Sequence, residues 1–204
     1  PGPAPADRVE GEALVVTFVG HSTVLFQTAG LNFLTDPVWS ESVGPLGGTG
    51  PTRKRPPAIR FEDLPPIDVV LISHNHYDHL DMPTVQRLAE QHSPRFLVPL
   101  GVDLLFDDED VPGAVAMAWW DGLDLGGGAR VTAAPAHHFS GRGLIDFDRT
   151  LWLSFVVEGP GGPVYYAGDT ALGPHFTQVH RRFGAQRLAR DHDTLDFGDR
   201  VLLR

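Results

Sequence analysis

Three histidines and an aspartate stand within six residues of this sequence, directly after an apolar run. The run covers residues 67–73, and the motif that follows it reads His74-Asn75-His76-Tyr77-Asp78-His79. A continuous apolar run of this length is typical of a strand buried on both faces. We therefore expect a β-strand whose carboxyl end delivers four ligand-type side chains into one loop, and this constrains the fold more than any other feature.

The side chains of this motif are of the types that bind metal ions. The chain has no cysteine, so imidazole and carboxylate groups must supply the ligands, and both bind zinc. Four such groups exceed what one tetrahedral ion takes from a single loop, so the motif favours two neighbouring metal ions. The alternative is a polar loop whose histidines are solvated or cap a turn.

Two later positions could supply further ligands. His137 and His138 follow a predicted strand, and only one of them can easily point inward because neighbours in extended chain face opposite ways. Asp169 follows an apolar strand that ends in Gly-Asp. Without the first motif, these histidines would be ordinary surface residues and the aspartate a turn or cap residue.

The hydrophobic pattern predicts a protein richer in strands than in helices. A chain of 204 residues can bury one sizeable core, so we expect a flexible lead-in over residues 1–12 and one domain over residues 13–204. Residues 37–66 are rich in proline and glycine and predict a long loop. Asp81 is expected to cap the first helix. The predicted strands are 14–19, 24–28, 31–35, 67–73, 96–99, 115–119, 131–134, 151–157 and 164–167, and the predicted helices are 82–92 and 174–183.

The charge of the chain excludes one class of partner. The formal net charge is -10, because 26 acidic residues face 16 lysines and arginines. A phosphate backbone is bound by surplus positive charge, so we expect no nucleic-acid partner. No stretch is long and apolar enough to span a membrane. We expect a cytoplasmic protein, with peripheral membrane contact left open, and the sequence does not indicate its oligomeric state.

Taken together, these motifs resemble the metallo-β-lactamase superfamily, in which His-x-His-x-Asp-His is followed by a distant histidine and a strand-terminal aspartate. Within it, the sequence is similar to the branch that contains N-acylphosphatidylethanolamine-hydrolysing phospholipase D. The resemblance extends over roughly residues 14–184. It is carried by Gly20-His21-Ser22-Thr23, Leu34-Thr35-Asp36-Pro37-Val38-Trp39, Gly50-Pro51-Thr52-Arg53, residues 73–81, Pro99-Leu100-Gly101-Val102, Trp119-Trp120, His138-Phe139-Ser140-Gly141-Arg142, Thr150-Leu151-Trp152 and Ala167-Gly168-Asp169-Thr170.

This resemblance implies a fold and a set of ligands. The fold is of the α+β class, a four-layer αβ/βα sandwich with two mixed sheets face to face and the metals at one edge. Two zinc ions are expected: the first would take His74, His76 and His138, and the second Asp78 and His79, with Asp169 bridging both. His138 is favoured over His137 because the ligand of this branch immediately precedes Phe-Ser-Gly-Arg. His21 and Asp36 are expected to orient the ligands or to serve in turns.

The resemblance also implies hydrolysis by a metal-bound hydroxide, which Asp78 or Asp169 could orient. A phospholipase-D-like phosphodiesterase acting on N-acyl phospholipids or related phosphodiesters is the leading interpretation, so the partner would be a phospholipid or small-molecule substrate. A lactone- or amide-cleaving enzyme and a non-catalytic metal-binding scaffold are the alternatives. The basic stretch 53–60 and Arg142 could attract an anionic head group, and the exposed aromatic residues Trp39 and Phe139 could contact an acyl chain. The alternative is that the basic stretch is a solvated loop and that the aromatic residues belong to the core.

The resemblance fades after residue 184, and the C-terminal part looks shortened. Family members continue to one more histidine that completes the second metal site, whereas residues 185–204 contain His192 without the expected surroundings. Residues 197–202 look like the family's terminal strand arriving early. We therefore expect firm binding at the first site and weaker binding at the second, where a water or His192 would supply the missing ligand.

Overall fold

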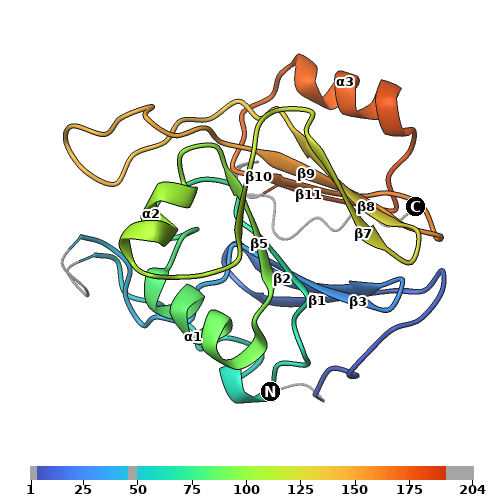
Figure 1. The fold of residues 1–204 in the computed structure, drawn as a ribbon, viewed down its shortest axis with the longest axis horizontal. Coiled ribbons are helices and arrows are strands. Elements are labelled where there is room, and N and C mark those ends of the chain that lie inside the picture. The colour runs from blue at the N-terminus through green and yellow to red at the C-terminus, as the bar shows by residue number, and fades with distance from the viewer. Residues whose placement is uncertain (1–3, 46–49, 192–204) are drawn as a thin grey trace.

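The computed structural model describes residues 4–45 and 50–191, which form two β-sheets with helices on their outer faces (Figure 1). The helices of this part are α1 (Met82–His92), α2 (Asp103–Asp108) and α3 (Pro174–Phe183), with a 3-10 helix at Phe61–Asp63. The strands are β1 (Leu14–Gly20), β2 (Thr23–Thr28), β3 (Leu31–Thr35), β4 (Val69–Leu71), β5 (Arg95–Pro99), β6 (Ala114–Met117), β7 (Gly122–Gly126), β8 (Ala129–Ala134), β9 (Ser154–Glu158), β10 (Val164–Gly168) and β11 (Leu188–Asp191).

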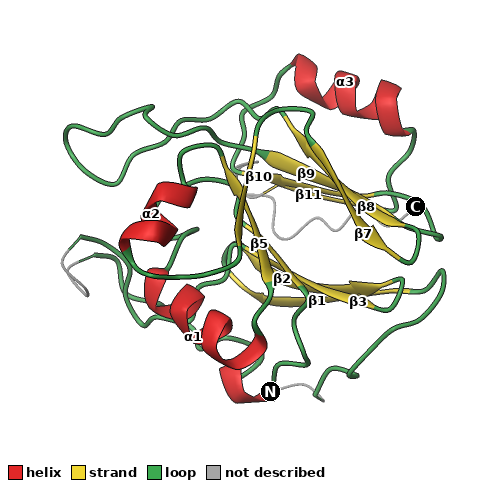
Figure 2. Ribbon diagram, viewed as in Figure 1, coloured by secondary structure: helices red, strands yellow, loops and turns green. Residues whose placement is uncertain are grey.

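Both sheets are mixed. The first has the order β1-β2-β3-β4-β5-β6, antiparallel from β1 to β3 and parallel from β3 to β6. The second has the order β11-β10-β9-β8-β7, with β11 parallel to β10 and the other pairs antiparallel. Helices α1 and α2 lie outside the first sheet and α3 outside the second (Figure 2). The predicted four-layer sandwich is confirmed.

The alternation of side chains along each strand builds the layers. In and after β4, Val69 and Leu71 contribute to the core between the sheets, while Val70 and Ile72 contribute to the core under α1. Successive side chains of a strand point to opposite faces, so an uninterrupted apolar run serves both cores at once. Burial of each such side chain stabilises the fold by about 1.5–3 kcal/mol. The apolar run is therefore fixed in both cores, and it holds the start of the histidine motif in place.

Helix α1 has the predicted bounds, but Asp81 acts differently from the prediction. Its side chain makes no capping hydrogen bond to the backbone of the helix. One carboxylate oxygen accepts from the backbone N–H groups of Trp39 and Ser40 and from the Thr84 hydroxyl, and the other accepts from the Ser40 hydroxyl. The predicted loop supplies these donors, so Asp81 fastens that loop to the start of α1.

The predicted start of one strand was wrong. The strand expected at 151–157 begins only at Ser154, because the N–H groups of Leu151 and Leu153 donate to Leu100 and Ser73 outside any strand pair. The sequence analysis missed α2, β7 and β11; β7 begins and ends in glycine, which weakens the strand pattern. The positions of His192 and the strand expected at 197–202 lie outside the described residues. No described helix has the length and apolar character that a membrane span needs.

Candidate metal centre

The histidine motif begins at the edge where parallel strands end. Strands β3 and β4 are parallel neighbours, so the residues that follow them, Asp36 and Ser73, come together. The backbone N–H of Ser73 donates to Asp36 Oδ1 at 2.7 Å. The chain then makes a turn in which the N–H of Leu80 donates to the carbonyl of His76 at 2.8 Å. This turn places the side chains of the motif around one point instead of along a line.

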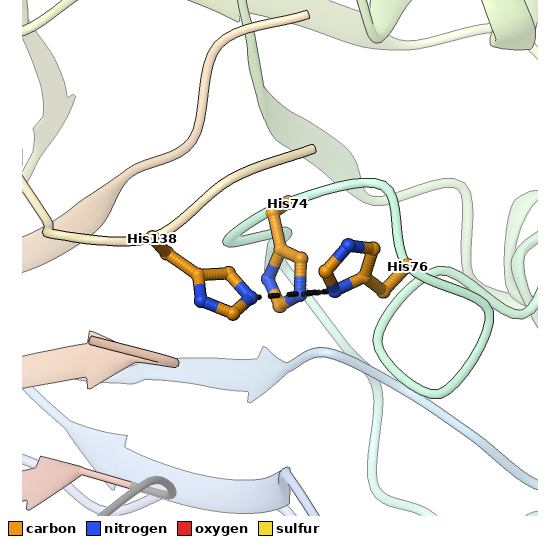
Figure 3. Close-up of side chains that lie close together, drawn as sticks. All are labelled: His74, His76 and His138. Carbon is orange, nitrogen blue, oxygen red and sulfur yellow. Dashed lines mark hydrogen bonds between the residues drawn. The ribbon is translucent and has the colours of Figure 1, made fainter. Parts of the chain in front are cut away.

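Three of the predicted ligands form one cluster. His74 Nε2 lies 2.8 Å from His76 Nδ1, and His138 Nε2 lies 3.3 Å from the same atom (Figure 3). The three ring nitrogens lie within 4.8 Å of one another, and His74 is buried. Two ligand atoms of a tetrahedral zinc ion are about 3.4 Å apart when its bonds are 2.0–2.2 Å long. The cluster therefore has the spacing of a metal site, with ligands from two distant segments.

The surroundings of His74 prepare it for a metal. The Ser73 hydroxyl donates to Asp36 Oδ2 at 2.5 Å, because a carboxylate can only accept. The same hydroxyl lies 2.9 Å from His74 Nδ1, so this nitrogen must be the protonated one. The lone pair of the His74 ring is then on Nε2, which faces the cluster. A hydrogen bond that selects the tautomer in this way is a common feature of metal-binding histidines.

The remaining predicted ligands form a second cluster beside the first. His79 Nε2 lies 3.3 Å from Asp169 Oδ1 and 3.9 Å from Asp78 Oδ2. Asp169 Oδ2 in turn lies 3.9 Å from His138 Nε2, so this carboxylate stands between the two clusters. His21 Nε2 lies 2.9 Å from Asp78 Oδ2. All six predicted ligands thus lie at one locus, and His137, which is exposed, does not.

The two clusters differ in their charge. Burial lowers the pKa of His79, but its interactions with Asp169 and Asp36 outweigh this and raise the pKa to about 10. Burial raises the pKa of Asp78, yet the hydrogen bond from His21 and the charge of His79 lower it to about 2. Burial lowers the pKa of His74 well below its usual value. Without a metal, the second cluster is therefore an ionised network, whereas His74 is neutral.

Asp36 joins the two sheets under this centre. Besides Ser73, its Oδ2 atom accepts from His79 Nδ1 at 2.7 Å and from the Tyr166 hydroxyl at 2.5 Å. Tyr166 lies in β10 of the second sheet, and Asp36 follows β3 of the first. Asp36 has a φ of +32°, a conformation that is costly for residues other than glycine and persists only when neighbours enforce it. The sequence analysis placed Asp36 near the ligands but missed Tyr166.

The segment that carries His138 is clamped to the histidine motif. One guanidinium nitrogen of Arg142 donates to the carbonyl oxygens of Asn75 and Leu80 at 2.9 and 2.8 Å. The Arg142 guanidinium carbon lies 3.9 Å from the ring centre of Tyr77. The side-chain oxygen of Asn75 also accepts from the N–H of Gly141. Arg142 was expected to attract a substrate head group, but one of its guanidinium nitrogens is engaged with the protein backbone.

A cavity of about 900 Å³ opens beside the ligands. His21, His76 and Asp78 line one part of it. The rest of its lining includes polar residues such as Ser40 and Thr52, one acidic residue, Glu41, and a larger set of apolar and basic residues: Phe18, Val19, Val38, Val43, Pro45, Pro51, Pro56, Arg53, Lys54 and Arg55. The cavity therefore joins the metal centre to a wall that is both apolar and cationic.

The structure also corrects and sharpens the expected substrate contacts. Trp39 was expected to be exposed, but it packs edge-on against Phe61 at 5.6 Å and donates to a backbone carbonyl. Phe139 is 42% exposed and lies 4.6 Å from the ring of His76. Arg53 donates to the Val38 carbonyl at 2.6 Å, so it serves the loop structure. Phe139 therefore keeps an exposed face, whereas Trp39 is partly buried against the core.

Comparison with known proteins identifies related sequences. Residues 31–190 match the family described as the Beta-lactamase superfamily domain. An uncharacterized protein of Mycobacterium tuberculosis is 40% identical over 174 residues, which cover 84% of this chain and 46% of that protein. The N-acyl-phosphatidylethanolamine-hydrolyzing phospholipase D 1 of Caenorhabditis elegans is 32% identical over 195 residues, which cover 90% of this chain and 55% of that protein. The chain thus spans about half the length of these relatives.

Solved structures share the fold. The diiron β-hydroxylase CmlA from Streptomyces venezuelae is similar with a TM-score of 0.65 and 26% identity. The similarity covers 87% of this chain and 34% of that one. That protein is described as a diiron enzyme, and part of its chain has the fold of this protein.

Proposed function

Because the chain belongs to the beta-lactamase superfamily, we propose that it is a metal-dependent hydrolase that cleaves phosphodiesters of the N-acyl phospholipid type. The match over residues 31–190 supports the hydrolase class. The similarity to the phospholipase D of Caenorhabditis elegans supports the substrate class. The two clusters of ligand-type side chains and the cavity beside them also support this proposal.

We assign two zinc ions to the two clusters. His74, His76 and His138 would hold the first, Asp78 and His79 the second, and Asp169 would contact both. When bound, zinc lowers the pKa of a water molecule and stabilises negative charge on a phosphoryl oxygen. Imidazole and carboxylate ligands suit zinc, but they also suit iron, the metal of CmlA. Metal analysis of the purified protein decides between the two.

The protein's own groups would position the reactants. Asp78 and Asp169 are the carboxylates that stand beside the ligand nitrogens, so either can accept a proton from the attacking water. Asp169 is mostly shielded from solvent, with 11% of its side chain exposed. A shielded carboxylate interacts more strongly with a neighbouring charge than one in water does. We therefore assign Asp169 the bridging role and either Asp78 or Asp169 the role of orienting the water.

The cavity is the observation that carries the substrate proposal. It begins at His76 and Asp78 and continues along a mainly apolar wall. Lys54 and Arg55 are exposed on this wall, although the chain as a whole has a formal net charge of -10. An anionic phosphodiester with an acyl chain would match both properties, because pockets bind ligands through apolar walls and a few placed polar groups.

Hydrolysis assays with a matched variant test the proposal. Zinc-loaded protein should cleave an N-acyl phosphatidylethanolamine and release phosphatidic acid, and His76→Ala should lose at least about a hundredfold in rate. A lactone and an amide serve as competing substrates. Equal rates for the two proteins would support the non-catalytic scaffold, and cleavage of the lactone or amide alone would support a different hydrolase.

A further inference from the structure

The turn between β1 and β2 brings a second histidine to the second cluster. His21 occupies this turn with a φ of +52°, in the left-handed region that few residues other than glycine adopt. Its neighbours hold the turn in place: the Ser22 hydroxyl donates to the carbonyl of Asp78 at 3.1 Å, and the Thr23 hydroxyl donates to the carbonyl of Asp36 at 2.8 Å. Strained backbone of this kind persists where the surroundings enforce it.

The His21 ring faces the inner side of Asp78. His21 Nε2 lies 2.9 Å from Asp78 Oδ2, which is the oxygen of Asp78 that lies 3.9 Å from His79 Nε2. Ligand atoms of His21, Asp78 and His79 all lie within 4.8 Å of one another. A residue that only oriented a metal ligand would contact it on the side away from the metal. His21 contacts the side that faces the other ligands.

We propose that His21 is a ligand of the second metal ion, together with Asp78, His79 and Asp169. This inference rests on the two-metal site of the proposed function. Asp169 Oδ1 lies 3.3 Å from His79 Nε2, so the set contains two imidazole nitrogens and two carboxylate oxygens. That is the number and type of ligands that a tetrahedral zinc ion takes. The second site is then complete within the described residues.

Replacing His21 tests this assignment, and His192 provides the matched control. His21→Asn keeps a residue that tolerates the left-handed turn and removes the imidazole. Each protein is stripped of metal, loaded with Co²⁺ and examined by proton NMR, in which the paramagnetic ion strongly shifts the ring N–H of every coordinating histidine. The wild type and His192→Ala should each give five shifted ring signals, from His21, His74, His76, His79 and His138. His21→Asn should give four.

Metal content measured on the same samples gives a second readout. Zinc bound per chain after gel filtration should fall from two to one in His21→Asn and stay at two in His192→Ala. Four shifted signals in the wild type, or loss of a signal in His192→Ala instead, would overturn the assignment while leaving the first site intact. A protein that binds no Co²⁺ or Zn²⁺ at all would instead contradict the proposed function.

Discussion

The Nδ1 atom of His79 lies 2.7 Å from a carboxylate oxygen of Asp36, and both side chains are fully buried. The carboxylate accepts the proton on Nδ1, so when the His79 ring loses its other proton the lone pair is left on Nε2, toward the other ligand-type groups. The same carboxylate selects the tautomer of His74 through Ser73. One aspartate therefore orients a histidine of each cluster.

Replacing Asp36 with asparagine should weaken metal binding at both sites. The amide cannot accept from all the donors that the carboxylate satisfies, so the ring orientations of His74 and His79 are lost. Mutation of a residue that hydrogen-bonds to metal ligands typically lowers the metal affinity by about 10- to 100-fold. Competition with a zinc chelator measures the effect. Asp68→Asn is the control, because Asp68 also accepts a backbone N–H, from Asn32, but contacts none of the ligands; an equal loss there would contradict the prediction.

Metal affinity should depend on pH differently at the two sites. The pKa of His79 is raised to about 10, so the ring is a cation at neutral pH and must lose its proton before a metal binds. Second-site affinity should therefore rise about tenfold per pH unit from about pH 6.5 to 10. Burial lowers the pKa of His74 and of His76, so these rings are already neutral above pH 6.5.

Calorimetric titration with Zn²⁺ in buffers of different ionisation enthalpy measures this difference. At pH 7.5 the second binding event should release one proton from His79, and the first should release none from His74 or His76. The variant His79→Gln should abolish the pH-dependent event. Parallel pH profiles for the two sites would show that His79 is not charged in the metal-free protein.

Replacing Arg142 with alanine should loosen the ligand loop. Arg142 donates to two backbone carbonyls, and hydrogen bonds from charged donors contribute about 1.5–3 kcal/mol each, so we expect the free energy of unfolding to fall by about 2–4 kcal/mol. Urea unfolding of the metal-free protein measures it. Arg60→Ala removes an arginine that is exposed and pairs with Asp63, and it should leave the midpoint nearly unchanged. A substrate-binding role for Arg142 would instead raise KM without changing stability.

Gly168→Ala should lower the stability of the protein and displace Ser73, which contacts His74. Gly168 has a φ of +64°, and a Cβ atom there would lie 2.6 Å from the Cβ of Ser73, which positions His74. The left-handed conformation costs about 1–2 kcal/mol and the overlap about 1–3 kcal/mol, so we expect a loss of about 2–5 kcal/mol. Gly127→Ala has a φ of +61° and open space around it, so only the first cost applies. Thermal unfolding compares the two variants.

The sequence predicted the layers better than it predicted the support of the site. Strands such as β2 and β10 and helices such as α1 follow from apolar periodicity, which depends only on near neighbours in the chain. The ligand loop was predictable because its side chains stand together after the apolar run. The contact of Asp36 with Tyr166 joins residues 130 positions apart, and no local sequence pattern predicts it.

For Arg142 and Trp39, the sequence indicated the chemical character of the side chain but not the groups that it contacts. Arg142 has the chemistry of an anion-binding group, and only the turn at His76 reveals that the backbone carbonyls of Asn75 and Leu80 stand in its reach. Trp39 has the chemistry of an acyl contact, but it packs against Phe61, which lies in a 3-10 helix that the sequence pattern did not predict. Which neighbour satisfies a polar or apolar group depends on tertiary structure.

The ligands of the first cluster come from both sheets: His74 and His76 follow β4, and His138 follows β8. Synthesis proceeds from the amino end, so a growing chain presents the first two imidazoles while the strands that carry the third are still to be made. Two nitrogens alone hold zinc only weakly. A metal ion held by all three rings would therefore be taken up late in the maturation of this protein, and it would join the later half of the chain to the earlier one.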